Sequence, residues 1–290
     1  MGEARGTLYV VATPIGNLGD VTLRALETLR AVPLIAAEDT RITRRLLDRY
    51  EITTRTISYH AQSGPARERE LLDHLGGGAD LAQVTDAGTP VVSDPGEGLV
   101  AAWAAAGGLV VAIPGASSVL AAVASAGLAG PRWSFEGFLP RSGRERRERL
   151  AAIAGDGRGT VVFEAPTRLA ATLRDLAAAC GADRPGAVCR ELTKMHEQVA
   201  RGTLGELMGL AADGSIPARG EVVVVVGWAM EAADLAASGP AAREDALTAA
   251  KAEVERLVAA GTARGEAAKR VAAATGIPRR ALYGSSPDGE

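Results

Sequence analysis

The sequence predicts an α/β protein built from two domains. Through its first third, short apolar runs alternate with helical stretches, which is the pattern of parallel strands joined by crossover helices. The length of 290 residues exceeds what one compact core usually organises. The composition, 47% hydrophobic and 23% charged, is typical of a folded chain, and 35 glycines with 14 prolines indicate many tight turns. We therefore expect two domains of ordinary size and a small appendage.

The first domain is expected over residues 1–114 and contains a sheet of five strands. The strands are expected at residues 8–12, 34–37, 57–59, 81–85 and 109–113. Leu23, Leu26 and Leu29 are spaced three residues apart and predict a helix after the first strand, with Asp20 as its cap. Strands and helices that alternate in this way indicate a parallel sheet.

The second domain is expected over residues 115–231. A helix rich in small residues is expected at 119–126. Five consecutive valines at 222–226 predict a central strand that is covered on both faces. The other strands of this domain are expected at residues 133–138, 160–163 and 187–189.

Beyond the second domain, residues 232–244 are rich in Ala, Ser, Gly and Pro and are expected to form a linker. Residues 245–290 are expected to form a small helical extension. Its end has the shape of a helix-turn-helix, with Gly276 in the turn and Pro278 at the start of the second helix. The extension either packs as a small bundle or contacts nucleic acid. The arginines expected to make such contacts are Arg279 and Arg280.

Charge and cysteine content exclude several classes of function. The net charge is only -3 and the pI is near 5.8, so any nucleic-acid surface must be local. Cys180 and Cys189 are too few for a disulfide framework and lack the spacing of a zinc site, so we expect no metal. No run approaches the roughly 18 apolar residues of a membrane span, and the N-terminus has no long apolar segment. We expect a cytoplasmic protein with no membrane contact.

Two loops at strand ends are candidate ligand sites. Residues 13–20 join a strand to a helix through one proline and two glycines. Their backbone N–H groups would face a bound anion, although a plain turn has the same composition. Residues 85–96 contain two Asp, two Pro and two Gly at the carboxyl end of a strand, where ligands of α/β sheets bind. A loop of this length favours a ligand site, and it suits a ribose diol or a sulfonium cation.

Charged residues follow three other strands. The segment 38–41, Glu-Asp-Thr-Arg, is either a helix cap or a carboxylate and a guanidinium that face the same crevice. Glu191 and Lys194 are either a surface ion pair or, because they lie beside a strand end, a functional pair in which burial would depress the pKa of the lysine. His60 is either an acid or base or a structural hydrogen-bonding residue.

Residues 141–149 contain five arginines against two glutamates. Such a segment is either a solvated helix face or a site of phosphate contact. Because the molecule as a whole is acidic, a local concentration of arginine is a fair candidate for binding RNA. The candidate contacts are Arg141, Arg144, Arg146 and Arg147.

A set of ordered motifs identifies a family resemblance. In chain order the motifs are TPIGNLGD from Thr13, AEDTR from Ala37, TDAGTPVVSDPG from Thr85, PGASSV from Pro114, EGFLPR from Glu136 and RELTK from Arg190. Together they resemble the 16S ribosomal RNA cytidine 2'-O-methyltransferases, the ribosomal small subunit methyltransferase I family of the tetrapyrrole methylase superfamily. The resemblance runs from about Gly6 to Gly227. The chain departs from the family at residues 60–63 and 165–167.

The resemblance implies the class III methyltransferase fold, with a parallel N-terminal sheet, a mixed C-terminal sheet and a small C-terminal helical extension. It also implies a homodimer and S-adenosyl-L-methionine bound between the domains. The implied substrate is cytidine 1402 in the decoding region of 16S rRNA, on the small ribosomal subunit. The cofactor contacts that it implies are Pro14, Gly16, Asp86, Ala87, Gly88, Thr89, Pro90, Ser117, Ser118, Phe163, Leu192 and Gly220.

Methyl transfer to a 2'-hydroxyl is an in-line displacement, so alignment supplies much of the rate and a base adds to it. Our hypothesis takes Lys194 as this base, oriented by Glu191 or Asp39, and adds Arg41 to the RNA contacts. Two rival readings remain at this point. One is a tetrapyrrole or diphthine-type methyltransferase of the same fold, and the other is a non-catalytic RNA-binding factor of ribosome assembly.

Overall fold

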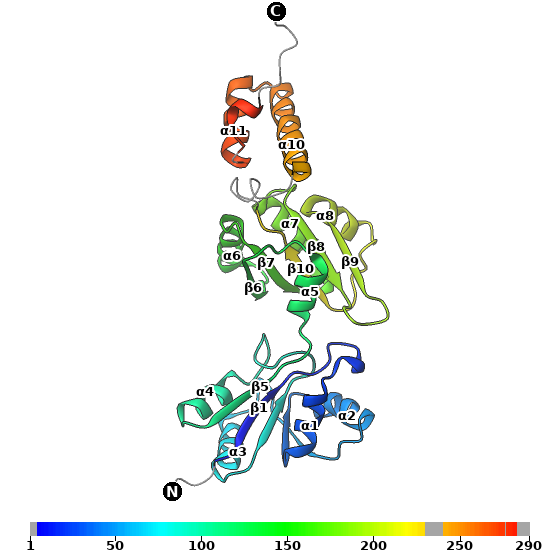
Figure 1. Cartoon of the computed structure of the whole chain (residues 1–290), viewed down its shortest axis with the longest axis vertical. Coiled ribbons are helices and arrows are strands. Elements are labelled where there is room, and N and C mark those ends of the chain that lie inside the picture. Colours follow the sequence, from blue (N-terminus) through cyan, green and yellow to red (C-terminus); the bar gives the residue numbers. More distant parts are fainter. Residues whose placement is uncertain (1–4, 230–239, 276, 283–290) are drawn as a thin grey trace, which may run out of the picture.

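The computed structural model describes residues 5–229, 240–275 and 277–282. Two α/β domains follow one another along the longest axis of the molecule, and two helices lie beyond the second domain (Figure 1). Each domain contains one five-stranded sheet. The expected two-domain α/β architecture is confirmed.

The first sheet is parallel throughout, with strand order β3-β2-β4-β1-β5. Its strands are β1 (Thr7–Val11), β2 (Leu34–Ala37), β3 (Arg55–Ser58), β4 (Leu81–Val84) and β5 (Leu109–Ile113). All five lie within two residues of the expected positions. Because every strand runs the same way, the loops that follow β1, β2 and β4 leave the same edge of the sheet.

Helices cover both faces of the first sheet because successive side chains of a strand point to opposite sides. On one face Ile35 of β2 packs in a cluster with Leu29 and Leu47, and on the other Leu8 of β1 packs with Leu75 and Leu99. The helices are α1 (Leu23–Ala31), α2 (Thr40–Arg49), α3 (Pro65–Gly76) and α4 (Glu97–Ala105). The central strands β2 and β4 are therefore wholly buried, and the loop edge of the sheet is left for a ligand.

The cap of α1 differs from the expected one. Asp20 ends a short 3-10 helix, η1 (Leu18–Asp20), and the side chain of Thr22 accepts the hydrogen bond from Ala25 N–H at 3.1 Å. The expectation that Asp20 caps α1 is wrong, because the 3-10 helix ends at Asp20 and Thr22 lies between it and α1. Thr22 also has the oxygen that a cap requires.

The second sheet is mixed, with strand order β6-β7-β10-β8-β9. β6 pairs with β7 in parallel, and the other neighbours pair antiparallel. The strands are β6 (Trp133–Phe138), β7 (Gly159–Glu164), β8 (Pro185–Arg190), β9 (Gln198–Thr203) and β10 (Val222–Val226). The valine strand β10 is central and wholly buried, as expected. The edge strand β9 was missed, because its sequence QVARGT has no apolar run.

The two faces of the second sheet differ in what they contact. One face packs against α6 (Gly143–Gly155), α7 (Leu169–Cys180) and α8 (Leu204–Ala212). The other face packs against α5 (Ser118–Ala126) and against two residues of the first domain, Ile15 and Ala87. The hydrophobic cluster on this second face therefore belongs to both domains and joins them.

The C-terminal extension contains α10 (Pro240–Ala259), α11 (Arg264–Thr275) and a 3-10 turn, η3 (Arg279–Leu282). Val254, Val271 and Leu282 form its own small core. α10 begins at Pro240, inside the expected linker, whose residues 232–239 lie outside the described part of the chain, as does Gly276. Where the second helix of a helix-turn-helix was expected, the structure describes only η3.

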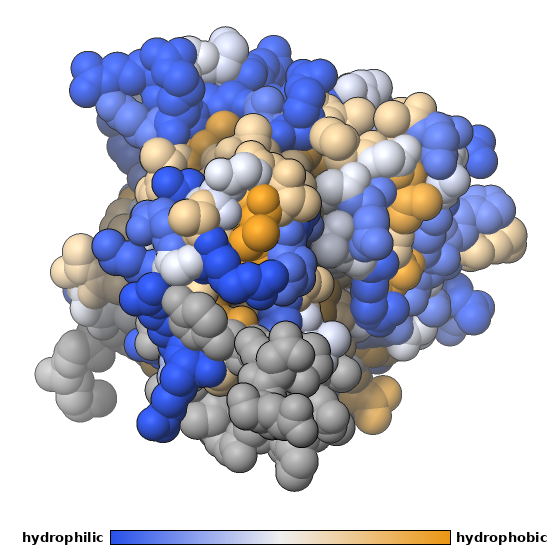
Figure 2. Space-filling view, turned by 90° about the horizontal axis from the view of Figure 1, so that it is seen from above, coloured by the Kyte–Doolittle hydropathy of each residue, from blue (hydrophilic) through white to orange (hydrophobic). Residues whose placement is uncertain are grey.

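The described surface is mostly polar. Seen along the long axis, hydrophilic residues cover most of the coloured surface, and the hydrophobic ones lie in small separate groups (Figure 2). Over the residues that the structure describes, none of the helices is long and apolar enough to cross a membrane. The large apolar clusters lie between helices and sheets and between the domains, while several large apolar side chains are exposed, among them Leu23 and Met195.

Candidate active site

A cavity of about 450 Å³ lies between the two domains. The first domain contributes the loop that follows β4, and the second contributes the start of α5, the ends of β6 and β7 and the start of β10. The cavity is lined by Ala87, Gly88, Thr89, Val92, Ser93, Asp94, Ser117, Ser118, Val119, Phe138, Phe163, Glu164, Ala165, Pro166, Gly220, Glu221, Val222 and Val223. Its position at strand ends between domains is where α/β proteins bind ligands.

The loop after β4 is fixed against the loop after β1. Thr13 N–H donates to the carbonyl of Gly88 at 2.8 Å, and Gly88 N–H donates to the carbonyl of Thr13 at 3.0 Å. Gly88 has a φ of +82°, which favours glycine, and a Cβ there would lie 3.4 Å from Ile15. The two loops that the sequence singled out are therefore joined by main-chain hydrogen bonds.

Helix α5 points its first turn at the cavity. Ser117 is its N-cap, and its hydroxyl accepts a hydrogen bond from Leu120 N–H at 3.4 Å. At the other end of the helix, the guanidinium of Arg201 donates to the carbonyl groups of Ser125 and Ala126. A cation at the C-terminus and free N–H groups at the N-terminus suit an anionic group in the cavity.

Aromatic and aliphatic side chains form the apolar part of the wall. The ring centroid of Phe163 lies 4.9 Å from that of Phe135 and 5.5 Å from that of Phe138. Phe138 is 60% exposed and stands at the open side, while Val222 and Val223 are buried. This surface suits a flat apolar group such as a purine ring.

Seven of the twelve expected cofactor residues line the cavity. They are Ala87, Gly88, Thr89, Ser117, Ser118, Phe163 and Gly220. The other five, Pro14, Gly16, Asp86, Pro90 and Leu192, are not part of the lining. Leu192 belongs to the hydrophobic cluster that joins the domains, and Gly16 lies under Lys194, whose Cγ would be 2.4 Å from a Cβ at that position.

Carboxyl groups gather at the ends of β2 and β4. Asp86 Oδ1 accepts a hydrogen bond from Asp39 N–H at 3.0 Å, and Glu38 Oε2 accepts one from Asp86 N–H at 3.3 Å. Burial raises the pKa of Glu38 and that of Asp86. Burial, and then the charges of Glu38 and Asp86, raise the pKa of Asp94 to about 6. The excess negative charge favours a cationic ligand nearby.

Asp39 caps a helix and is also tied to an arginine. Its Oδ1 accepts hydrogen bonds from Arg41 N–H at 2.8 Å and Arg41 Nε at 3.0 Å, and Oδ2 lies 2.6 Å from Arg41 Nη2. These bonds hold the pKa of Asp39 far below its usual range. The expectation of a helix cap is confirmed, and the alternative of a carboxylate and a guanidinium that face the same crevice stays a prediction.

Lys194 lies between two glutamates. Its Nζ is 2.9 Å from Glu191 Oε1 and 3.2 Å from Glu221 Oε1. Burial by itself lowers the pKa of Lys194, but the hydrogen bond to Glu191 and the charge of Glu221 outweigh burial and raise it. The expectation of a depressed lysine pKa is wrong, because the sequence did not reveal Glu221 as a second partner. The raised pKa does not support the expectation that burial prepares Lys194 to accept a proton, and its role as the base stays a prediction.

The loop that carries Lys194 is held in an unusual backbone conformation. Glu191 and Thr193 have φ values of +52° and +67°. The buried guanidinium of Arg190 donates to the carbonyl of His196 at 3.1 Å, which closes the loop. Residues held in this region of backbone space cluster at functional sites.

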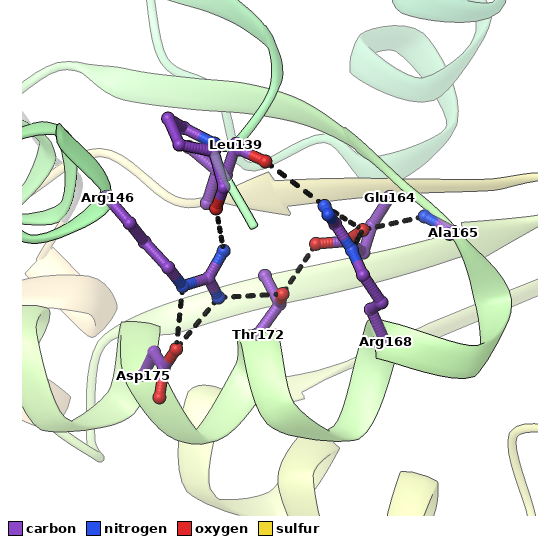
Figure 3. A network of polar contacts seen from close by, with 8 residues as sticks. Leu139, Arg146, Glu164, Ala165, Arg168, Thr172 and Asp175 are labelled. Carbon is purple, nitrogen blue, oxygen red and sulfur yellow. Dashed lines mark hydrogen bonds and ion pairs between the residues drawn. The ribbon is translucent and has the colours of Figure 1, made fainter. Parts of the chain in front are cut away.

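A buried polar network supports the wall of the cavity at the end of β7 (Figure 3). Glu164 Oε1 accepts from Arg168 Nε at 2.6 Å and from Ala165 N–H at 2.7 Å, and Oε2 accepts from Thr172 Oγ1 at 2.5 Å. Arg146 donates to Thr172 at 3.0 Å and to Asp175 at 2.8 Å. The network fixes Ala165, which lines the cavity, to helices α6 and α7.

Arg146 is consequently not available to RNA. Its side chain is 9% exposed and is paired with Asp175, so its expected role in RNA binding is wrong. The charge pattern of the segment did not reveal which arginine faces inward. The other expected contacts, Arg41, Arg141, Arg144, Arg147, Arg279 and Arg280, are exposed or nearly so. His60 is exposed as well, beside a separate hollow.

The sequence did not identify Asp94 and Phe138 as residues that line the cavity. Asp94 lies in the loop 85–96, which was recognised as a ligand site, but the resemblance assigned only its first half. Glu221 also lines the cavity. Its position directly before the valine strand was the feature of the sequence that could have identified it. Groups of His, Cys, Asp and Glu that would hold a metal ion are absent from the described residues.

The fold and this cavity define a methylase of the tetrapyrrole type. The model of the tetrapyrrole (corrin/porphyrin) methylases matches residues 7–208. The ribosomal RNA small subunit methyltransferase I of Synechocystis is 46% identical over 96% of this chain and 96% of its own, and that of Bacillus subtilis is 40% identical over 96% and 93%. The chain therefore belongs to the ribosomal RNA small subunit methyltransferase I family.

Solved structures with this fold are more distant. Cobalt precorrin-4 methyltransferase has a TM-score of 0.60 at 19% identity, over 77% of this chain and 95% of its own. Uroporphyrin-III C-methyltransferase of Thermus thermophilus, in complex with S-adenosylhomocysteine, has a TM-score of 0.55 at 20% identity, over 77% and 97%. At these identities the likeness shows the fold.

Proposed function

We propose that this protein methylates the ribose 2'-hydroxyl of cytidine 1402 in the decoding region of 16S rRNA, with S-adenosylmethionine as the methyl donor. Family membership supports an rRNA methyltransferase. The single observation that carries the proposal is the cavity between the domains, because loops from both domains that the resemblance assigns to the cofactor meet there.

The cavity fits the cofactor in size and in chemistry. Its volume of about 450 Å³ lies in the range of small-molecule sites. Phe163 and Val223 suit the adenine, the N-terminus of α5 at Ser117 suits the carboxylate, and the acidic side near Asp94 favours the sulfonium. Gly88 and Thr89 would hold it through their backbone. The expected contacts that do not line the cavity, such as Gly16, would support this lining from behind.

When bound, the cofactor supplies an electrophilic methyl group. The chain then has to align the ribose hydroxyl with that methyl and to exclude water, and alignment of this kind supplies a large share of the rate. We assign Phe138 to the exclusion of water at the open side. Protonated Lys194 holds Glu191 and Glu221 in place on the opposite wall.

We assign RNA binding to the exposed arginines. Arg141, Arg144 and Arg147 on or beside α6 would contact phosphates, as would Arg41 near the acidic wall. Arg279 and Arg280 would extend this surface. Each phosphate contact releases counterions, so affinity for the small subunit should fall steeply with salt.

We further propose a cytoplasmic homodimer, in keeping with a ribosomal substrate. Large apolar side chains lie at the described surface, among them Leu23, 79% exposed, and Met195, 94% exposed. A second copy would cover such side chains. Sedimentation velocity at micromolar concentration tests the dimer directly.

Methyl incorporation tests the function. Small ribosomal subunits from a strain that lacks the enzyme are incubated with radiolabelled S-adenosylmethionine, and the methylated ribose is mapped by mass spectrometry. One methyl per subunit at cytidine 1402 is expected. Methylation of a porphyrinoid or of a protein instead of RNA would support a tetrapyrrole or diphthine-type enzyme, and subunit binding without incorporation would support a non-catalytic assembly factor.

A further inference from the structure

Three glutamates and aspartates line the cavity, and they differ in how they are partnered. The carboxylate of Glu164 is tied to Arg168, and that of Glu221 is paired with Lys194. Asp94 has no ion-pair partner among the described residues. It is therefore the lining carboxylate with an oxygen left to interact with a substrate.

We propose that Asp94 is the catalytic residue that accepts the proton of the ribose 2'-hydroxyl during methyl transfer. This inference rests on the proposed function and names the group that performs its proton transfer. The base that the sequence suggested, Lys194, is held in ion pairs with Glu191 and Glu221. Asp39 is tied to Arg41, and Glu38 and Asp86 are absent from the lining.

The backbone around Asp94 is held in a costly conformation. Val91 and Ser93 have φ values of +75° and +64°, a region that side chains other than glycine rarely adopt. After Asp94, the buried side chain of Gln83 donates to the carbonyl of Pro95 at 3.2 Å. Gly96 leaves room for that amide, because a Cβ there would lie 1.5 Å from Gln83 Nε2. The strand below thus fixes the position of Asp94, as a catalytic group requires.

The surroundings also give Asp94 a suitable basicity. Burial, and the charges of Glu38 and Asp86 from the ends of the neighbouring strands, raise its pKa to about 6. A base is most effective when its pKa lies near the working pH, since it is then ionised and still a good acceptor. At pH 7 most of the Asp94 carboxyl groups are ionised.

The proton transfer balances the charges of the reaction. As the bond between the 2'-oxygen and the methyl carbon forms, the bond from that carbon to sulfur breaks, and its electron pair stays on sulfur. The hydroxyl proton moves to a carboxylate oxygen of Asp94. The cationic sulfonium and the anionic carboxylate become a neutral thioether and a neutral carboxylic acid, and water later removes the proton.

The Asp94→Asn variant tests the proposal, because it keeps the shape and removes the acceptor. Single-turnover methyl incorporation into small subunits is measured between pH 5 and 9, and cofactor affinity by calorimetry. We expect at least a 100-fold lower rate at pH 7, loss of the acidic limb of the pH profile, and a cofactor Kd raised by no more than about tenfold, since Asp94 also contributes to the acidic side that favours the sulfonium. A rate within fivefold of wild type would overturn the proposal, and so would a loss confined to the cofactor Kd.

Glu38→Gln is the matched variant. Removing this neighbouring charge lowers the pKa of Asp94, so the acidic limb should move to lower pH while turnover persists. An unmoved limb would contradict the assignment. If the wild-type enzyme itself fails to methylate the subunit, the proposed function fails; if wild type is active and Asp94→Asn is equally active, the inference about Asp94 alone fails.

Thermal unfolding gives a readout that needs neither cofactor nor RNA. The pKa of Asp94 in the folded protein is above its unfolded value, so ionising it costs stability as the pH rises from about 4 to about 6. Asp94→Asn should therefore raise the Tm at pH 7 and leave it nearly unchanged at pH 4. A lower Tm at pH 7 would mean that the carboxylate is structural, which contradicts the proposal.

Discussion

The two walls of the cavity differ in whether their carboxylates have a cationic partner. On the wall from the second domain, the carboxylates of Glu164, Glu191 and Glu221 all have an arginine or lysine partner. On the wall from the first domain, Asp94 lies near two further carboxyl groups, and its pKa is raised. One wall is neutralised and the other carries excess negative charge.

This difference indicates that one wall holds the shape of the site and that the other takes part in the reaction. Paired charges and satisfied hydrogen bonds hold a surface in one conformation, whereas unpaired acids in a partly buried site have pKa values close to the pH of the cell. We infer that the second domain shapes the cofactor site and that the first domain performs the proton transfer. Variants on the second wall should change stability, affinity or geometry and leave the pH profile alone.

The largest expected effect comes from breaking the buried network. Glu164→Leu leaves Arg168, Thr172 and Ala165 N–H without their acceptor, so we expect the free energy of unfolding to fall by about 3 kcal/mol. Denaturant unfolding measures this change. Glu148→Leu, which removes an exposed i,i+4 pair with Arg144, is the control and should change stability by less than about 0.5 kcal/mol. Equal effects of the two variants would remove the distinction between the walls.

A smaller effect is expected at the lysine of the second wall. Lys194→Met keeps the stem that covers Gly16 but leaves Glu191 and Glu221 without their cation. We expect the single-turnover rate to fall about tenfold, equivalent to about 1.4 kcal/mol in the barrier, with the acidic limb unmoved. If instead the variant abolishes the pH dependence, the base lies on the second wall, and the assignment of proton transfer to the first domain is wrong.

The arginines of α6 give a further contrast. Arg147→Ala should weaken binding to the small subunit and lower the slope of log affinity against log salt by about 1. Arg146→Ala should leave that slope unchanged and lower stability, because its guanidinium holds Thr172 and Asp175. Binding titrations at several salt concentrations distinguish the two. A change of slope with Arg146→Ala would contradict the buried role.

The smallest expected effect is at the cap of α2. Asp39→Ala removes a partly exposed side chain whose pKa is lowered by Arg41, so its contribution to stability is present at neutral pH and is lost as the pH falls below about 3.8. We expect a Tm lower by about 2 °C at pH 7, and a smaller difference in acid. Turnover more than tenfold lower would make Asp39 part of the reaction.

The sequence predicted the fold better than the site. Apolar runs and their spacing are enough to place the strands of a parallel sheet, and its central strands are buried on both faces, as Ile35 and Leu34 of β2 show. β9 escaped because an edge strand needs no apolar run. The motifs also placed the loops around the cavity.

What the sequence could not supply is the partner of each charge. Arg146 and Arg147 are neighbours in the chain, yet one is buried and the other exposed. The pKa of Lys194 is raised by its hydrogen bond to Glu191 and also by the charge of Glu221, which is far along the chain but lies beside it. Asp94 is unusual because Glu38 and Asp86 come from neighbouring strands. All three properties depend on tertiary contacts, which spacing along the chain does not encode.

The hydrophobic cluster shared by the domains has a consequence for the way ligands enter and leave. Ile15 and Ala87 pack among side chains of the second sheet. Moving the domains apart would expose this apolar surface to water, which is unfavourable in free energy. We therefore expect the part of the site next to this cluster to keep one conformation. We therefore expect exchange of methyl donor and product to involve side chains such as the exposed Phe138, which lines the cavity, rather than rotation of the domains.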